Sequence, residues 1–237
     1  MTYILCVDTS STVSCVALGS IQQEDESRYD ILSIKLISST ESKERSHGPG
    51  LLGLISTVCE VAGISLNEID VFASGVGPGT FTGIRIGLTT IKTLAWTLKK
   101  PIITVSAFDI FRLTAPASHP NKVVLIDARR RDFYTDWEGD GKSGTGTLIT
   151  PEEICSQVTA CEDWFLTGNA PAEQAATIAP LLVEGRFSTQ NEITPELLFK
   201  ACINKLIASD FADTVTSQPL YIRPPDAEIS VKMRKIE

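Results

Sequence analysis

The sequence predicts an α/β protein made of two similar units, each a mixed sheet flanked by helices. Three observations point to this fold class. Strand-length apolar runs alternate with stretches at helical spacing, in the order βββαβαβα over the first half. Two apolar runs, at 3–8 and 122–127, each end in an aspartate followed by a hairpin turn. The length of 237 residues suits one large domain or two closely packed lobes, and the repeated pattern favours two lobes. We therefore expect an N-terminal lobe over 1–115 and a C-terminal lobe over 116–237.

The first unit opens with three strands joined by short connections, which predicts an antiparallel meander. Two amphipathic helices follow, each ended by a stop signal, Gly63 for the first and Lys99-Lys100-Pro101 for the second. The expected strands are 3–8, 13–18, 31–37, 69–76 and 102–105, with a charged insertion at 21–30. The expected helices are 51–62, 84–98 and 107–113.

The second unit begins after a linker near 116–121 that is rich in Pro, Ser and Asn. It repeats the strand, aspartate and hairpin of the first unit, which suggests internal duplication, although the halves share little sequence identity. The expected strands are 122–127, 132–138, 147–149 and 164–167, with a flexible excursion at 139–146. Helices are expected after Pro151 and over 195–208, with one more between them.

Composition excludes several classes of protein. Apolar residues make up 43% and charged residues 21%, which excludes a disordered or collagen-like chain. A formal charge of −8 argues against free-standing nucleic-acid binding, because phosphate backbones attract basic surfaces. A partner is therefore expected to supply much of any RNA contact. The start, 1–8, lacks a basic leader, and no apolar run is long enough to cross a bilayer, so we expect a cytoplasmic protein without membrane attachment.

The histidines and cysteines argue against a metal centre. Two histidines cannot build a histidine-rich site, and the six cysteines contain no CxxC pair. Cys6 and Cys15 could face each other across the first hairpin, but buried reduced thiols are the simpler interpretation. Ser46 and His47 are neighbours in sequence without the geometry of a nucleophile and its base, so no catalytic residue is expected.

The glycine-rich segment 75–87 is the strongest local motif. It follows a predicted strand and opens a predicted helix, where free amides and the helix dipole favour an anion. It lacks the lysine and spacing of a Walker A loop, and three residues separate Gly79 from Gly83, so it is not GxGxxG. Two interpretations stay open, a structural turn and an anion- or substrate-binding loop.

Two aspartate turns are a second candidate site. Asp8 precedes Thr9 and Ser10, and Asp127 precedes Ala128 and Arg129. In nucleotide-dependent two-lobe folds, such turns hold phosphates and magnesium. The alternative is an aspartate that accepts hydrogen bonds from the amides of its own turn.

In order and spacing, these motifs resemble those of the TsaB (YeaZ) family. The resemblance rests on Asp8-Thr9-Ser10, on Asp127-Ala128-Arg129 with Tyr134, and on the ending from Pro219 to Ala227. Its most specific part is the signature loop, with Gly77, Pro78, Gly79, Thr80, Phe81, Thr82, Gly83 and Arg85. The resemblance implies the actin-like (ASKHA) ATPase fold. It also implies a role in forming N6-threonylcarbamoyladenosine at position 37 of tRNAs that read codons starting with A.

In that family TsaB is the non-catalytic relative of TsaD, which transfers the threonylcarbamoyl group. The resemblance implies a heterodimer with TsaD, joined by the ATPase TsaE, and tRNA contact mainly through the complex. TsaD-like relatives hold a metal with an HxxxH pair, whereas here Leu51 stands four residues after His47. The segment 166–171 also matches an adenosine loop poorly. We therefore expect no metal or nucleotide cofactor, and Asp8, Thr9, Ser10 and Asp127 as vestiges of phosphate turns.

The expected partner surface lies on the helices spanning 50–62 and 82–98. Each helix has a set of small or apolar residues beyond the stripe that faces its own sheet. The set is Leu52 and Cys59 on the first helix, and Gly83, Ile86, Gly87, Thr90, Thr93 and Thr97 on the second. With Gly87 facing outward, this surface could meet the equivalent pair on TsaD, or form a homodimer when the chain is alone.

Two other functions remain alternatives. One is a standalone enzyme, either an ASKHA-type ATPase or kinase or a peptidase-like protein. The other is a module that senses a nucleotide without turning it over. The basic tail, with Lys232, Arg234 and Lys235, either touches tRNA or simply solvates the end of the chain.

Overall fold

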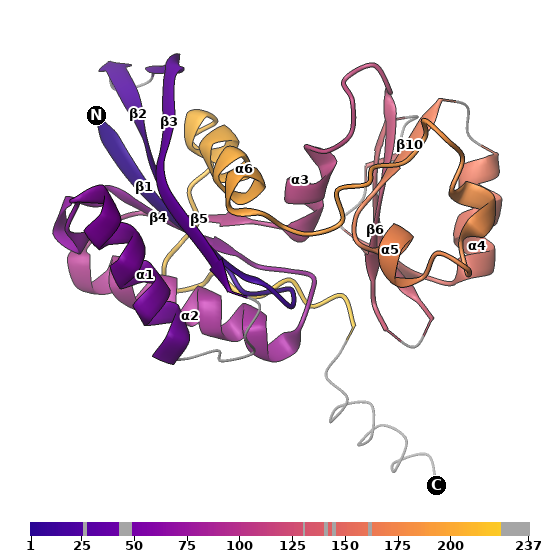
Figure 1. The fold of residues 1–237 in the computed structure, drawn as a ribbon, viewed down its shortest axis with the longest axis horizontal. Coiled ribbons are helices and arrows are strands. Elements are labelled where there is room, and N and C mark those ends of the chain that lie inside the picture. Colours follow the sequence, from indigo (N-terminus) through magenta and orange to yellow (C-terminus); the bar gives the residue numbers. More distant parts are fainter. Residues whose placement is uncertain are drawn as a thin grey trace, which may run out of the picture.

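Two lobes lie side by side in the computed structural model of this chain (Figure 1). The structure describes residues 1–25, 28–42, 49–129, 131–139, 142–143, 146–160 and 163–223. Each lobe is built on a five-stranded mixed sheet with helices packed on it, so the predicted α/β fold class is confirmed. Among the described residues, no helix is long and apolar enough to cross a membrane.

The N-terminal sheet has the strand order β3-β2-β1-β4-β5. The strands are β1 (Thr2–Asp8), β2 (Ser14–Asp25), β3 (Arg28–Ser42), β4 (Val71–Gly75) and β5 (Ile102–Val105). The first three form the predicted antiparallel meander, and β4 and β5 continue the sheet in parallel. Helices α1 (Pro49–Ala62) and α2 (Phe81–Leu98) pack on one face, where Leu5 and Val7 of β1 meet Ile55 and Ile91. The period-2 alternation of β1 turns Ile4 and Cys6 to the opposite face.

The C-terminal sheet has the order β10-β6-β7-β8, with β9 also paired to β7. Its strands are β6 (Asn121–Asp127), β7 (Phe133–Gly139), β8 (Lys142–Ser143), β9 (Thr147–Ile149) and β10 (Trp164–Thr167). Val123 and Leu125 of β6 pack against Ile154 and Val158 of helix α4 (Pro151–Thr159). Three short helices complete the elements, η1 (Leu66–Glu68), α5 (Ala170–Glu173) and η2 (Ala179–Leu181).

Helices α3 (Ala107–Arg112) and α6 (Pro195–Ile207) fill the space between the two sheets. One hydrophobic cluster contains Ile4 of β1, Phe108 of α3, Ile126 of β6 and Phe199 of α6. Helix α6 packs against β2, β3 and β5, so it covers the second face of the N-terminal sheet. The expected division at residue 115 is therefore wrong for α6, whose packing belongs to the first lobe. That face needs an apolar cover, and the chain returns from the second lobe to provide it.

The predicted elements are otherwise found close to their expected positions. The expected charged insertion at 21–30 is instead the outer part of the β2–β3 hairpin, because both strands run beyond their apolar cores. The expected flexible excursion at 139–146 contains the two-residue strand β8. The five described cysteines are free thiols, and Cys6 pairs in register with Ala17 rather than facing Cys15.

A C-terminal strap, residues 209–223, ties the two lobes together. Ala212 N donates to Ile102 O at 2.9 Å, and Leu220 N donates to Val76 O at 2.8 Å, at the end of β4. Arg223 then reaches the β6–β7 turn, where it donates to Ala128 O at 3.0 Å. Hydrogen bonds from the strap backbone to the first sheet, and from the Arg223 side chain to the second, thus join the two lobes.

Helix α3 is joined to the C-terminal sheet by charge as well as by apolar packing. Arg112 Nη2 lies 2.5 Å from Asp136 Oδ2, and Arg112 Nε lies 2.9 Å from Glu138 Oε2 on β7. The Asp136 side chain is largely shielded from water, so its ion pair with Arg112 is screened less than a pair on an open surface. The lobes are therefore linked by α3 as well as by the strap.

The packing of α6 on the first sheet predicts unequal effects of two glycine substitutions. A Cβ at Gly19 of β2 would lie 2.3 Å from the Phe199 ring of α6, whereas a Cβ at Gly53 of α1 would meet nothing within 4 Å. Gly19→Ala should therefore lower the free energy of unfolding by about 1–3 kcal/mol, as overpacking does. Gly53→Ala, the matched control, should raise it by about 0.5–1 kcal/mol through helix propensity.

Urea unfolding of the two variants checks this prediction. Equal free energies of unfolding for Gly19→Ala and the unsubstituted protein would contradict the packing of α6 against β2.

Candidate functional site

The first aspartate turn joins β1 to β2 at residues 9–13. Asp8, the last residue of β1, is 1% exposed, and its Oδ1 accepts a hydrogen bond from Ser10 N at 3.0 Å. Ser10 Oγ lies 3.0 Å from both carboxylate oxygens. Burial raises the pKa of Asp8 to about 6, although the hydrogen bonds from Ser10 partly oppose that rise. The turn thus satisfies its own carboxylate.

The signature loop closes over this turn. Thr80 N donates to Ser10 O at 2.6 Å, and Ala107 N donates to Gly77 O at 2.7 Å. A Cβ at Gly75 would lie 1.8 Å from Asp8 Oδ2, and one at Gly79 would lie 2.2 Å from Ser10 O. Both positions therefore require glycine, because the loop approaches the turn too closely for a side chain. This contact favours the structural-turn interpretation of the glycine-rich segment.

Gly83 and Gly87 bring helix α2 onto the same turn. A Cβ at Gly83 would lie 1.9 Å from Thr9 O, and one at Gly87 would lie 2.5 Å from Thr9 Oγ1. Thr9 Oγ1 also donates to Gly83 O at 2.5 Å. The expectation that Gly83 and Gly87 face a partner is therefore wrong. They belong to the buried stripe of α2, which also contains Ile84, Leu88, Ile91 and Ala95.

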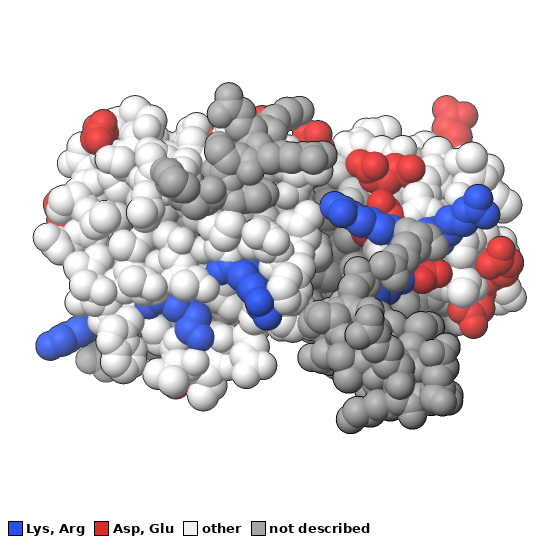
Figure 2. All heavy atoms as spheres, turned by 90° about the horizontal axis from the view of Figure 1, so that it is seen from below, with Lys and Arg blue, Asp and Glu red and all other residues white. Residues whose placement is uncertain are grey.

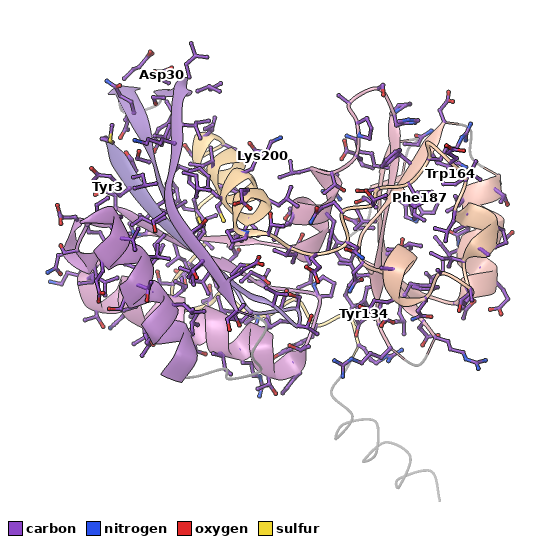
Figure 3. All side chains as sticks on the ribbon, in the orientation of Figure 1. Tyr3, Asp30, Tyr134, Trp164, Phe187 and Lys200 are labelled. Atoms are coloured by element: carbon purple, nitrogen blue, oxygen red, sulfur yellow. The ribbon has the colours of Figure 1, made fainter. Side chains whose placement is uncertain are left out.

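The carboxylate of the second aspartate turn also accepts hydrogen bonds from nearby groups of the protein. Asp127 Oδ1 accepts hydrogen bonds from Arg129 N at 2.8 Å and from Gln174 Nε2. Asp127 N donates to Asn169 Oδ1 at 2.8 Å, which places the segment after β10 against the end of β6. Tyr134, labelled in Figure 3, lies on β7 and is half-buried against the core between the lobes.

A magnesium–phosphate pair needs an exposed carboxylate and free turn amides. Asp8 is buried, and Ser10 already donates to its carboxylate, so the first turn does not fit such a ligand. Within the described ranges, no group of three or more His, Cys, Asp and Glu side chains is arranged to hold a metal ion. His47 lies outside the described residues.

The expected partner surface is partly open. Leu52 is 55% exposed and lines an open groove of about 630 Å³ between α1 and η1, together with Ile55, Ile64 and Leu66. Cys59 also lines the groove but is itself buried. On α2, Thr93 and Thr97 are exposed, whereas Ile86 and Thr90 are half-buried. The surface that remains for a partner is therefore the α1 groove and the outer ridge of α2.

A cluster that the sequence did not predict joins the signature loop to the strap. Arg85 Nε donates to Tyr221 Oη at 2.7 Å, and the Arg85 guanidinium lies 3.8 Å from the centre of the Phe81 ring. The Phe81 and Tyr221 rings stack with their centres 5.1 Å apart. These residues belong to two of the motifs described above. The sequence does not predict their contact, because Arg85 and Tyr221 are 136 positions apart.

Comparison with known proteins finds relatives among TsaD and TsaB proteins. A family model described as "TsaD: tRNA N6-adenosine threonylcarbamoyltransferase" matches residues 31–224. The Escherichia coli "tRNA threonylcarbamoyladenosine biosynthesis protein TsaB" is 35% identical over 180 residues, which cover 70% of this chain and 70% of that protein. The TsaB proteins of Haemophilus influenzae and Bacillus subtilis are 30% and 32% identical.

Several of these matches are partial. The chain spans about half the length of the Haemophilus and Bacillus relatives, 51% and 53%. It also matches the tRNA N6-adenosine threonylcarbamoyltransferase of Methylorubrum populi, at 33% identity over 35% of that protein. Among solved structures, YeaZ from Pseudomonas aeruginosa superposes with a TM-score of 0.70, over 93% of this chain and 100% of that chain. At 24% identity this likeness shows a common fold.

The buried Asp8 predicts a specific pH dependence of stability. Because the pKa is about 6 in the folded protein and ordinarily 3.8, the folded state holds its proton where the unfolded chain has lost it. Stability should therefore fall as pH rises from about 4 to about 6, by at most about 3 kcal/mol. Asp8→Asn removes this titration, so the stability of the protein relative to this variant should fall over that range.

Urea unfolding at several pH values between 4 and 7 measures the difference. Glu173→Gln, which changes an exposed carboxylate, is the matched control and should follow the unsubstituted protein. Parallel pH curves for Asp8→Asn and the unsubstituted protein would contradict the burial of an ionisable Asp8.

Proposed function

The chain belongs to the family that the TsaD model describes, and TsaB proteins are among its relatives. We propose that it is a non-catalytic subunit in tRNA threonylcarbamoyladenosine synthesis. In this proposal it binds and supports TsaD, which transfers the threonylcarbamoyl group to the adenosine at position 37. The ATPase TsaE joins the pair, and the assembly works in the cytoplasm.

The closed aspartate turn is the observation that most supports a non-catalytic role. In an ATPase of this fold, the turn after the first strand must present its carboxylate and amides to the nucleotide. Here Asp8 is fully buried, Thr80 N is bonded to Ser10 O, and Gly83 contacts Thr9. A phosphate at this turn would have to displace the signature loop. The proposal therefore includes no bound nucleotide and no metal cofactor.

A TsaD partner is supported by the similarity between this chain and TsaD proteins. Subunits with a common fold can pair through equivalent surfaces about a pseudo-twofold axis. The groove beside Leu52, with Thr93 and Thr97 on the outer ridge of α2, offers apolar and small side chains for such a contact. The same surface would form a homodimer in the absence of TsaD, so the two assemblies should compete.

Reconstitution tests the proposed role. The chain alone should neither hydrolyse ATP nor modify an unmodified tRNA transcript, and its addition to TsaD and TsaE with ATP and a threonylcarbamoyl donor should restore modification. Nucleoside analysis by mass spectrometry measures the product. ATP turnover by the repurified chain on the order of 1 s⁻¹, within the ordinary enzyme range, would instead support a standalone ATPase.

The partner surface predicts a selective loss of TsaD binding. Leu52→Glu places a charge in the α1 groove and should weaken TsaD binding at least tenfold, because an unpaired charge in an apolar contact is costly. Leu32→Glu, at a 96% exposed position on β3, is the matched control and should bind normally.

Calorimetric titration with TsaD measures both affinities, and a thermal melt confirms that each variant is folded. A folded Leu52→Glu variant with full affinity for TsaD would place the contact elsewhere on the chain.

A further inference from the structure

Charge is unevenly distributed in this acidic protein. Residues 71–108, which include β4, the signature loop, α2 and β5, contain no Asp or Glu. The same stretch contains Arg85, Lys92, Lys99 and Lys100. The chain as a whole has a formal charge of −8, so its acidic groups lie elsewhere. Helix α2 is thus a locally basic element.

The strap brings a second basic segment beside α2. Tyr221 accepts a hydrogen bond from Arg85 near the start of α2, and two residues later Arg223 bonds to Ala128 O and Asp132 in the β6–β7 turn. Tyr221 and Arg223 are only two residues apart, so the strap runs directly from α2 to that turn. Lys92 Nζ donates to two strap carbonyls, at 2.9 and 2.8 Å. The strap therefore joins basic groups of both lobes into one surface.

We call this surface the basic face. It comprises Arg85, Lys92, Arg129, Arg131 and Arg223. Figure 2 shows the corresponding side of the molecule, where basic side chains extend across both lobes. Acidic side chains are sparse over the N-terminal lobe in that view, whereas on the C-terminal lobe several lie beside the basic ones. The basic groups are therefore spread along the molecule and are not confined to one lobe.

Two arginines of the basic face can bind a ligand. Arg129 and Arg131 are exposed, and within the described part of the chain neither forms an ion pair with a carboxylate. Both have positive φ, of 59° and 71°, in the turn that Arg223 holds in place. Two acids near the face are engaged, since Asp132 pairs with Arg223 and Asp213 accepts hydrogen bonds from Thr216. Guanidinium groups without a carboxylate partner suit recognition of phosphate oxygens.

Exposed aromatic rings lie beside these charges. Phe81 is 40% exposed and Tyr221 is 38% exposed, with Arg85 over the Phe81 ring. Guanidinium groups next to partly exposed rings are typical of surfaces that bind single-stranded nucleic acid, where rings stack on bases. An acidic peptide needs only the charges, so the rings favour RNA over an acidic protein segment.

We propose that the basic face contacts the phosphate backbone of the tRNA held by the complex with TsaD. This inference rests on the proposed function and adds the surface through which this subunit touches the substrate. With a net charge of −8, the isolated chain should bind RNA weakly. The face therefore adds affinity only where the partner already holds the tRNA.

The test neutralises the two unpaired arginines. Arg129→Asn combined with Arg131→Asn removes two charges and suits positive φ, because Asn tolerates the left-handed region. Lys35→Asn combined with Lys200→Asn removes the same charge from exposed positions on β3 and α6. Lys200 lies on the side of the molecule away from the β6–β7 turn (Figure 3). Fluorescence anisotropy with an unmodified tRNA transcript measures the affinity of each complex with TsaD as a function of salt.

We expect the arginine variant to bind TsaD normally and to lose about tenfold in tRNA affinity near 0.1 M salt. The slope of log affinity against log salt should decrease by about 1.4–1.8, the value for two lost phosphate contacts. The lysine variant should retain the affinity and slope of the unsubstituted complex.

Three results would overturn the inference. If the unsubstituted complex modifies tRNA and the arginine variant keeps its affinity and slope, the basic face is wrong and the proposed function stands. A loss of TsaD binding by the arginine variant would make the face a protein contact. If the unsubstituted complex neither binds nor modifies tRNA, the proposed function fails and this inference fails with it.

Discussion

The close approach between the β1–β2 turn and the segment from Gly75 to Gly87 is the constraint on which the rest of this structure depends. Side chains are excluded at Gly75, Gly79, Gly83 and Gly87 because Asp8, Thr9 and Ser10 occupy the space that a Cβ would need. The contact fixes how α2 crosses the N-terminal sheet. It also buries the Asp8 carboxylate in a position where a two-lobe ATPase would expose one.

Two further connections make the lobes a single unit. Helices α3 and α6 share one hydrophobic cluster with both sheets, and the strap fastens β4 and α2 to the β6–β7 turn. A cleft that opens and closes around a nucleotide would have to break these contacts. The structure therefore suits a subunit that presents fixed surfaces to its partners, in agreement with the role proposed for it.

The surfaces inferred for TsaD and for tRNA lie on different sides of α2. Ile86 and Leu94 pack toward the cluster shared with α1, beside the groove that Leu52 lines. Arg85 and Lys92, seven residues apart and hence on one side of the helix, contact the strap. One helix thus separates an apolar contact surface from a basic one. A partner on the groove would leave the basic face accessible to RNA.

The sequence by itself determined most of the secondary structure and the fold class. Apolar periodicity placed α2 and β1 within a few residues of their true bounds, because burial of one helix face or strand run imposes that period. The motifs around Asp8 and Gly79 also identified the family. Only the tertiary structure decided which way Gly87 faces, since a glycine in a helix suits its own sheet and a partner equally. It also decided where α6 packs and that Arg85 meets Tyr221, because both depend on contacts between residues far apart in the chain, which local periodicity does not encode.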